Sequence, residues 1–367
     1  MQKIKVNLGK NSYNILICSD ELNKLGPCLK RLNIGNDAVI VTNVKIKKLF
    51  GNKLKKQLVS SGFNVKFETI HDGEKAKSEK ECMRLLNNIS KIDTLRRLFI
   101  IALGGGVTGD LAGFTASVYK RGIPYVHVPT TLLSQVDSAI GGKTAIDLSA
   151  GKNLVGAFYQ PKLVFSDSSF LKSLPEKEII SGLAEAIKYG IIKSPHLFSF
   201  IEKNYKKILK YDKKCLQRII YECSFIKARI VEKDEMDNKN IRVVLNLGHT
   251  IGHAIEAAVS YHKVYNHGQA VALGILSSVY IARKMNLLTE KSSHRIANVI
   301  KNVGLPVKLK NVNLKNILLA QSHDKKFIHG RNRFVLPLKI GKVIVKESVP
   351  EHIVKDAIKG LYESKKR

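Results

Sequence analysis

Short apolar segments alternate with amphipathic ones through the first part of the chain. β-Branched and aromatic residues bounded by turn residues predict strands over residues 3–6, 13–17, 37–42, 65–70 and 98–103. Apolar residues at helical spacing predict helices over residues 46–60 and 77–89. Strands that alternate with helices are typical of a parallel sheet flanked by helices. We therefore expect an α/β fold for this part of the chain.

Helical periodicity prevails after about residue 167. Ser173 and Glu176 form the pattern of a capping box, with a proline early in the first turn, and so predict the start of a helix. The apolar stripe of this helix consists of Ile180, Leu183, Ile187 and Ile191. An extended pair is predicted near residues 333–336 and 343–345, within otherwise helical sequence.

The chain of 367 residues is 44% hydrophobic, which is enough for a buried core and typical of two domains. The change of pattern places the boundary near residues 167–173. We expect an α/β domain over residues 1–172 and a mainly α-helical domain over residues 173–367.

The formal net charge is +32, from 62 basic and 30 acidic residues. Such a charge suits a nucleic-acid-binding protein, an enzyme of anionic substrates, or a genome whose codon bias favours lysine. The lysines are scattered, however, and neither aromatic stacking residues nor zinc-finger spacing accompany them. We therefore expect no specific nucleic-acid partner and interpret most of the lysines as a solvated surface.

The five cysteines form no CxxC motif and leave an odd number, so neither a disulfide framework nor a cysteine–zinc site is predicted. This usage suits a reducing cytosol. The N-terminal residues contain no hydrophobic signal region, and no run of about 18 apolar residues occurs. We therefore expect a cytoplasmic protein without a membrane partner.

Glycines, lysines and paired threonines are concentrated between residues 103 and 160. A strand that ends at a tight glycine turn and leads into a helix presents backbone N–H groups, which bind anions. Gly104, Gly106 and Gly109 match the spacing of the dinucleotide fingerprint, but the acidic residue expected about 20 positions later is missing. The glycines therefore form either a plain tight turn or a pyrophosphate site in a variant of the Rossmann fold.

Polar residues favour the second alternative. Lys143, Lys152 and Asn153 lie in glycine-rich surroundings, which a plain turn does not explain. The loop from Asp72 to Lys75 follows a predicted strand, where ligands of α/β sheets bind, although a surface turn explains this loop equally well. We interpret the region as a phosphate-handling site.

Candidate metal ligands occur in the second part of the chain. Glu185 lies opposite the apolar stripe of its predicted helix, and His249, His253 and Glu256 share one face of a later helix. The spacing of the two histidines resembles that of zinc proteases, but the glutamate between them is missing. His267 begins the next helix, and with Glu185 and His249 it would give a set typical of catalytic zinc. Spacing alone does not distinguish this set from the pair His249 and His253 as metal ligands. A third alternative is that the histidines bind no metal and only pack between helices.

A series of segments carries more specific information. They are GGGVTGD, YKRG, VPTTLLSQVDSAIGGKTAID, GKNLVGAFYQP, SGLAEAIKYG, LNLGHTIGHAIEA, NHGQAVALG and DKK followed by RFVLP. Together, and in this order, they resemble the 3-dehydroquinate synthase family from about residue 72 to residue 337. Single segments are shared with other sugar phosphate cyclases and with glycerol and iron-dependent alcohol dehydrogenases, whereas the full set is specific.

The resemblance implies an NAD-binding α/β domain that is a Rossmann-like variant, a helical domain that carries Zn²⁺ or Co²⁺, an active site between them, and a homodimer. It also implies the conversion of 3-deoxy-D-arabino-heptulosonate 7-phosphate into 3-dehydroquinate and phosphate, in the shikimate pathway. In this reaction NAD⁺ takes a hydride from the substrate, phosphate is eliminated, the hydride returns, and an intramolecular aldol step closes the ring. A different sugar phosphate cyclase, or a metal-dependent polyol dehydrogenase, is the alternative.

The resemblance implies roles for single residues as well. The implied metal ligands are Glu185, His249 and His267. The implied cofactor contacts are Asp72, Glu74, Lys75, Gly105, Gly106, Val107, Asp110, Thr130 and Thr131, to which we add Lys143 and Lys152. The implied substrate contacts are Lys143, Asn153, Asn246, His253 and Lys326 near the phosphate, and Asp137, Lys188, Lys227 and Arg242 at the hydroxyls and the carboxylate. Arg121 is expected to reach the site of the neighbouring subunit.

Two positions depart from the family's pattern. The interval from Lys227 to Arg242 is about one residue longer than the pattern, which makes Lys227 the weakest match. Thr42 and Asn43 stand where some relatives have an acidic residue, so the contact to the adenosine ribose is not predicted.

Overall fold

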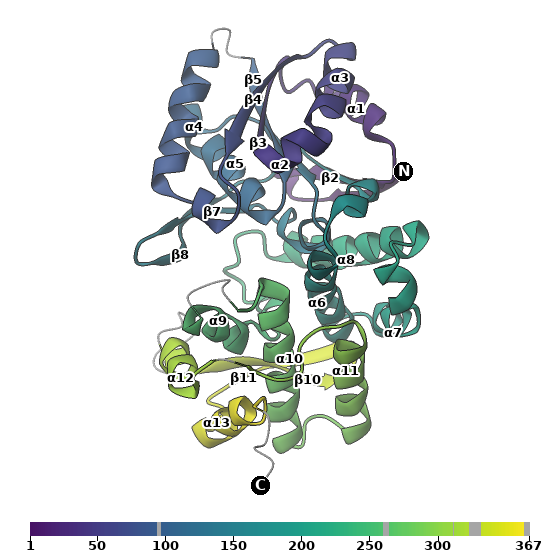
Figure 1. Cartoon of the computed structure of the whole chain (residues 1–367), viewed down its shortest axis with the longest axis vertical. Helices are drawn as coiled ribbons and strands as arrows, with labels where there is room; N and C mark the ends of the chain where they lie inside the picture. Colours follow the sequence, from purple (N-terminus) through teal and green to yellow (C-terminus); the bar gives the residue numbers. More distant parts are fainter. Residues whose placement is uncertain (94–96, 260–263, 311, 323–331, 363–367) are drawn as a thin grey trace. The chain divides into compact units, whose positions relative to one another are not determined.

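The computed structural model describes residues 1–93, 97–259, 264–310, 312–322 and 332–362. The chain divides into two compact units, which are Met1–Leu174 with Leu216–Met236, and Pro175–Cys215 with Asp237–Arg367 (Figure 1). Most of the long helix α8 (Lys213–Lys233) thus belongs to the first unit, although it follows the predicted boundary in the sequence. The assignment of NAD to one domain and of the metal to the other stays a prediction.

A seven-stranded sheet forms the centre of the first unit, in the order β1-β2-β9-β6-β5-β3-β4. β1 pairs with β2 in antiparallel fashion, and all other neighbours are parallel. The strands are β1 (Gln2–Val6), β2 (Tyr13–Cys18), β3 (Asp37–Asn43), β4 (Asn64–Ile70), β5 (Leu98–Gly104), β6 (Tyr125–Pro129) and β9 (Leu163–Asp167). The five predicted strands are confirmed, whereas periodicity does not predict the short strands β6 and β9.

Helices cover both faces of this sheet (Figure 1). α1 (Leu25–Leu32) and α3 (Asn52–Ser60) pack on one face, and α4 (Glu79–Ile92) and α5 (Gly106–Val118) pack on the other. The residues of β5 alternate between the two cores, with Phe99 facing the first and Ile100 the second. A strand covered on both faces is apolar along its length, which is why residues 98–103 are recognisable in the sequence.

The predicted helices of this unit are confirmed. α2 (Val44–Ile46), a π-helical segment (Lys47–Gly51) and α3 form the helical stretch predicted over residues 46–60. α4 begins after Ser78, whose side chain accepts a hydrogen bond from the backbone N–H of Glu81.

An antiparallel hairpin of β7 (Lys143–Leu148) and β8 (Gly151–Phe158) completes the glycine-rich region. Periodicity does not predict this hairpin, because β8 is only partly buried and lacks a regular apolar alternation.

The second unit is mainly helical, as predicted. Its helices are α6 (Glu176–Ile192), α7 (Pro195–Leu209), α9 (His249–Ala258), α10 (His267–Lys284), α11 (Glu290–Asn302), α12 (Leu314–Ser322) and α13 (Glu351–Lys359). β10 (Arg333–Lys339) and β11 (Lys342–Glu347) form the predicted extended pair. The α/β class of the first part and the helical class of the second are therefore confirmed.

The predicted capping box at Ser173 is wrong. α6 begins at Glu176 without a side-chain cap, and the Ser173 hydroxyl donates to the carbonyl of Phe170 instead. Residues 168–173 form a 3₁₀ helix, so Ser173 ends one helical segment rather than starting the next. A capping box does form at Asn266 and Gln269, at the start of α10.

None of the helices in the described part of the chain is long and apolar enough to cross a membrane.

Candidate active site

The glycine-rich turn lies where β5 ends and α5 begins. Gly105 is the residue before the first turn of α5, and the backbone N–H of Thr130 donates to the carbonyl of Gly104 over 2.9 Å. Gly109 lies against the ring of His127 on β6, and a Cβ atom at this position would come within 2.1 Å of that ring. The third glycine of the fingerprint is thus required by the packing of α5 on the sheet, and the N–H groups of Gly105 and Gly106 remain the candidates for an anion.

The implied NAD contacts follow the carboxyl ends of neighbouring parallel strands. Asp72 follows β4, the glycine turn follows β5, and Thr130 and Thr131 follow β6. The order of the strands reverses between β3 and β5, because β4 lies on one side of this point and β6 on the other. Ligands of open α/β sheets bind at such a point.

Asn43, at the end of β3, donates from Nδ2 to Oδ1 of Asp72 over 2.8 Å. This contact places Asn43 at the same edge of the sheet as the implied NAD contacts. Since an amide is a donor as well as an acceptor, Asn43 holds the Asp72 side chain at the carboxyl end of the sheet.

Lys77 is a candidate site residue that the sequence did not reveal. Its ammonium group donates to Oδ2 of Asp110 over 2.8 Å and to Oδ1 of Asn153, and its side chain is only 4% exposed. Burial lowers the pKa of Lys77, but the carboxylate of Asp110 more than compensates and the pKa is raised. Lys77 therefore connects two predicted site residues, one from α5 and one from β8. A buried lysine is rare, and nothing in the local sequence distinguishes it from its exposed neighbour Lys75.

Asn153 has a left-handed backbone, with φ +53°. Its N–H donates to Oδ1 of Asp147 over 2.8 Å, so the bend in β8 is held by a side chain of β7. Asparagine tolerates this conformation better than most residues. The bend directs the amide of Asn153 towards Lys77.

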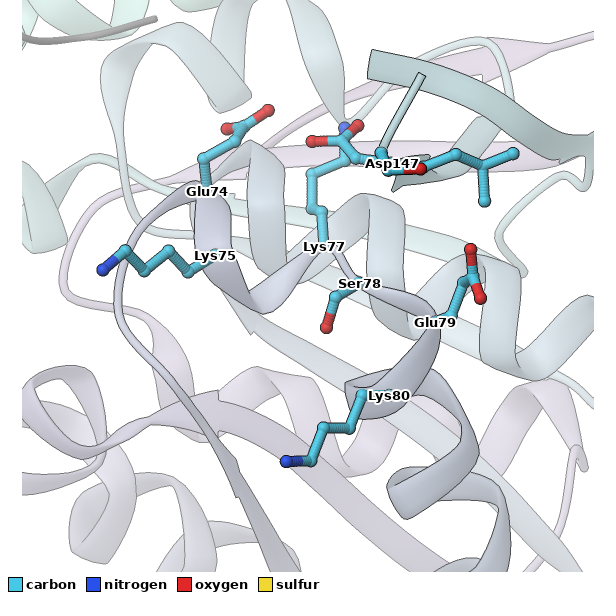
Figure 2. Close-up of a pocket in the computed structure, with 9 residues that line it drawn as sticks. Glu74, Lys75, Lys77, Ser78, Glu79, Lys80 and Asp147 are labelled. Atoms are coloured by element: carbon cyan, nitrogen blue, oxygen red, sulfur yellow. The ribbon is translucent and has the colours of Figure 1, made fainter. Parts of the chain in front are cut away.

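A cavity of about 500 Å³ opens between the start of α4 and the β7–β8 turn (Figure 2). Figure 2 shows Lys77 extending toward Asp147, while Lys75 and Lys80 point away from it. The cavity is lined by Glu74, Lys75, Lys77, Ser78, Glu79, Lys80, Asp147, Leu148 and Ser149. Glu74 also forms an ion pair with Lys152 over 3.1 Å, which connects the predicted loop to the hairpin.

Two implied substrate contacts of the first unit, Asp137 and Lys227, lie together. The ammonium group of Lys227 donates to the backbone carbonyl of Asp137 over 2.9 Å and pairs with its carboxylate. Lys227 is the weakest match to the family, and its role stays a prediction. Lys143 begins β7 and is exposed, and Arg121 lies in a turn with φ +62°.

The other implied substrate contacts belong to the second unit. Lys188 is buried on α6 and pairs with Glu185, and Arg242 is buried in the 3₁₀ segment that ends at Asn246. His253 is exposed on α9. Lys326 lies outside the described residues.

Three helices bring Glu185, His249 and His267 together. Oε1 of Glu185 lies 3.5 Å from Nε2 of His249 and 3.4 Å from Nε2 of His267. Four ligands at the usual zinc distances are about 3.3 Å apart in a tetrahedral site. The three ligand atoms lie within 4.8 Å of one another. Their spacing and chemistry therefore fit a divalent cation with an open position for a substrate or water.

Glu185 is fully buried, although it lies opposite the apolar stripe of its helix. α6 is buried on nearly all sides, because other parts of its unit cover the polar face too. Neither carboxylate oxygen accepts a hydrogen bond from the described residues, although Lys188 and the two histidines lie close. Lys188 supplies one positive charge to this buried carboxylate, and the two histidine nitrogens that also face it complete a donor set that fits a metal ion.

His267 is subject to opposing effects. Burial lowers its pKa, but the carboxylates of Glu185 and Glu256 outweigh burial and raise the pKa to about 10. The two carboxylates thus surround the ring with negative charge, and this charge also favours a bound metal cation. The rings of the alternative pair, His249 and His253, also lie close, with centroids 5.2 Å apart. The carboxylate of Glu185, however, contacts the rings of His249 and His267.

Family comparisons cover most of the chain. The family described as 3-dehydroquinate synthase N-terminal matches residues 67–181, and the family described as 3-dehydroquinate synthase C-terminal matches residues 182–327. The 3-dehydroquinate synthase of Desulforamulus reducens is 42% identical over 352 residues, which cover 96% of this chain and 98% of that protein. The enzyme of the same name from Thermodesulfovibrio yellowstonii is 44% identical over 348 residues, covering 94% and 95% of the two chains.

Solved structures share the fold. A 2-deoxy-scyllo-inosose synthase complexed with carbaglucose-6-phosphate, NAD⁺ and Co²⁺ has a TM-score of 0.89 and 25% identity, and the match covers 98% of this chain and 100% of that one. A 2-epi-5-epi-valiolone synthase of Streptomyces hygroscopicus has a TM-score of 0.88 and 24% identity, over 97% and 98% of the two chains. A probable glycerol dehydrogenase of Sinorhizobium meliloti is less similar, with a TM-score of 0.66 and 17% identity over 95% and 96%.

Proposed function

The chain belongs to the 3-dehydroquinate synthase family, and we propose from this that it converts 3-deoxy-D-arabino-heptulosonate 7-phosphate into 3-dehydroquinate and phosphate. The enzyme is then a phosphate-eliminating lyase of the shikimate pathway. The observation that carries the proposal in the structure is the convergence of Glu185, His249 and His267, in which Oε1 of Glu185 lies 3.5 Å and 3.4 Å from Nε2 of the two histidines.

The cofactors are NAD and a divalent metal ion, Zn²⁺ or Co²⁺. The similar 2-deoxy-scyllo-inosose synthase holds NAD⁺ and Co²⁺, and the donor set of this chain suits either ion. When bound, the cation would acidify a substrate hydroxyl, and NAD⁺ would accept the hydride from the carbon that bears this hydroxyl. Glu185, His249 and His267 would hold the cation, and the N–H groups of the turn after β5 would hold the pyrophosphate of NAD.

The chain's own residues would bind and orient the substrate. Its phosphate and carboxylate are anionic, so cationic side chains that are already fixed by protein contacts suit both. The ammonium group of Lys227 is fixed by Asp137, and that of Lys188 by Glu185. The groups proposed at the phosphate are Lys143, Asn153, Asn246, His253 and Lys326, and those proposed at the hydroxyls and the carboxylate are Asp137, Lys188, Lys227 and Arg242.

We also propose a homodimer in which Arg121 completes the site of the partner subunit. Lys120 and Arg121 are consecutive non-glycine residues in left-handed conformations, with φ +48° and +62°. Such strain is typical of functional turns. A cytoplasmic location is proposed as well, since all five cysteines are free thiols.

The test combines purified protein, NAD⁺, Zn²⁺ and the heptulosonate phosphate, with phosphate release and NADH absorbance measured together. Catalytic phosphate release without accumulation of NADH is expected, because the hydride returns to the substrate in each turnover. NADH that accumulates without phosphate would indicate a polyol dehydrogenase. Neither signal from a folded, zinc-binding protein would indicate a cyclase of another sugar phosphate.

A further inference from the structure

Glu256 is an acidic residue that lies beside the Glu185–His249–His267 cluster without belonging to it. It lies on α9, seven residues after His249, and therefore on the same face of that helix. Its side chain is only 7% exposed. A carboxylate that is buried to this degree requires a partner, and a ring of the metal cluster lies within its reach.

The two ring nitrogens of His267 face two different carboxylates. Nε2 lies 3.4 Å from Oε1 of Glu185, and Nδ1 lies 3.4 Å from Oε2 of Glu256. Both carboxylates can only accept hydrogen bonds, but only Glu185 belongs to the proposed ligand set, so a cation bound at Nε2 would leave the ring proton on Nδ1, where Glu256 accepts it. In the neutral ring Nε2 then keeps its lone pair, which is the atom that a cation would bind.

His249 has the same arrangement with a different acceptor. Its Nδ1 lies 3.2 Å from the backbone carbonyl of Leu247, and its Nε2 lies 3.5 Å from Oε1 of Glu185. The carbonyl, like a carboxylate, can only accept. Both rings are therefore oriented with Nδ1 on a protein acceptor and Nε2 towards Glu185. The main chain orients one ring, and the side chain of Glu256 orients the other.

We propose that Glu256 is a positioning residue of the metal site. It accepts a hydrogen bond from Nδ1 of His267, fixes the ring in the tautomer that leaves Nε2 available, and makes the ring a stronger ligand through its negative charge. Outer carboxylates that contact a ligand histidine act in this way in metalloproteins, and their removal typically costs about 10- to 100-fold in metal affinity. The inference rests on the proposed metal site.

A second arrangement of the same residues makes a different prediction. His253, Glu256 and His267 also lie close enough to hold a cation of their own. In that case Glu256 would be a ligand and Nδ1 of His267 would have to carry a metal in place of a proton. The protein would then bind two cations per chain.

The test measures Zn²⁺ affinity and stoichiometry by competition with a coloured chelator. The variants are Glu256→Ala, which removes the acceptor, and Glu256→Gln, which keeps an acceptor oxygen without the charge. Glu202→Gln is the matched control, because Glu202 in the same unit contacts Arg295 and not a histidine. Circular dichroism verifies the fold of each variant, and Glu256→Gln, which keeps the side-chain volume, carries the test if Glu256→Ala does not fold.

We expect one Zn²⁺ per chain in the wild type and a dissociation constant about 10- to 100-fold larger for Glu256→Ala. Glu256→Gln should lie between the two, and Glu202→Gln should match the wild type. The visible spectrum of the Co²⁺-loaded protein should change in Glu256→Ala, since a released ring alters the ligand geometry. A purely structural role of Glu256 would leave this spectrum unchanged.

Unchanged Zn²⁺ affinity in Glu256→Ala would overturn the inference. A wild type that binds two Zn²⁺ per chain, together with a Glu256→Ala variant that binds only one, would overturn it as well. The proposed reaction is tested independently by the phosphate-release assay. If the wild type turns over the heptulosonate phosphate, but Glu256→Ala binds Zn²⁺ as tightly as the wild type, only the role of Glu256 is refuted. If the wild type shows no turnover, but Glu256→Ala binds Zn²⁺ more weakly than the wild type, only the proposed reaction is refuted.

Discussion

Lys77 connects two candidate site residues through one buried ammonium group. Asp110 and Asn153 come from different elements, and no other contact described here joins them. The charge of Lys77 therefore stabilises the local fold and the geometry of the site at the same time. Its neighbour Lys75 carries the same charge in an exposed position, and it is a natural control.

Lys77→Met should lower the free energy of unfolding by about 2 kcal/mol, because Asp110 loses its charge partner. It should also weaken NAD⁺ binding, since Asp110 and Asn153 are no longer held together. Urea unfolding and a fluorescence titration with NAD⁺ measure the two effects. Lys75→Met should leave stability unchanged, and Lys77→Met combined with Asp110→Asn should be more stable than Lys77→Met alone. Equal destabilisation by the two lysine variants would contradict this interpretation.

His127 makes stability depend on pH. Burial lowers its pKa from 6.5 to about 4, so the unfolded chain takes up the proton first when the pH falls. The stability that comes from the neutral ring is complete above about pH 6.5 and is lost progressively towards pH 4, by about 3 kcal/mol at most.

His127→Phe removes the titrating group and keeps a ring of similar size. Between pH 7 and pH 5 the free energy of unfolding should fall by about 2 kcal/mol more in the wild type than in the variant. Urea unfolding at the two pH values measures the difference. Parallel pH profiles for the two proteins would show that the native His127 ring is not protected from protonation.

At the scale of elements, the packing of α5 on β6 requires a glycine at position 109, in the first turn of α5. Gly109 and His127 touch so closely that no side chain fits between them. The N–H groups of Gly105 and Gly106 can serve an anion, whereas Gly109 serves the contact between helix and sheet.

Gly109→Ala should therefore destabilise the protein by about 2 kcal/mol or more, since a methyl group in this contact forces the helix away from the sheet. His127→Ala should restore part of this loss in the double variant, because it makes room for the methyl group. Thermal unfolding of the two single variants and the double variant measures the coupling. Additive losses would indicate that Gly109 is required by its backbone and not by His127.

The metal cluster depends on elements that are distant in the sequence. Glu185 lies on α6, His249 on α9 and His267 on α10, and only α10 begins with a capping box in its local sequence. Only the packing of α6 and α9 against α10 brings the three side chains together. A helix start is encoded locally, whereas the partner of a helix face is not.

At the scale of the whole molecule, the proposed dimer makes activity a property of two chains. Arg121→Ala and His267→Ala should each be nearly inactive as pure proteins. After the two variants are unfolded and refolded together, mixed dimers have one site with a functional metal cluster and a wild-type Arg121 from the partner. Activity should recover to about a quarter of the wild-type value. If Arg121 acts within its own chain, the mixture stays inactive.

The sequence by itself determined the elements and the family. Buried strands such as β5 carry apolar runs, amphipathic helices carry a period, and the motifs from GGGVTGD to RFVLP are legible without coordinates. The resemblance also named Glu185, His249 and His267, which spacing alone could not separate from His249 and His253. Their roles as ligands, and those of the other site residues, stay predictions until they are measured.

The tertiary structure alone decided which polar residues are buried and what they contact. Lys77 looks like an ordinary polar residue in the sequence, and the contacts of Asn43 and Glu256 are not visible there either, yet each of the three contacts a candidate site residue. The hairpin of β7 and β8 and the start of α6 were likewise misjudged or missed from local patterns. Burial and hydrogen bonding depend on neighbours that are distant along the chain, whereas periodicity and capping signals report only on the nearest residues.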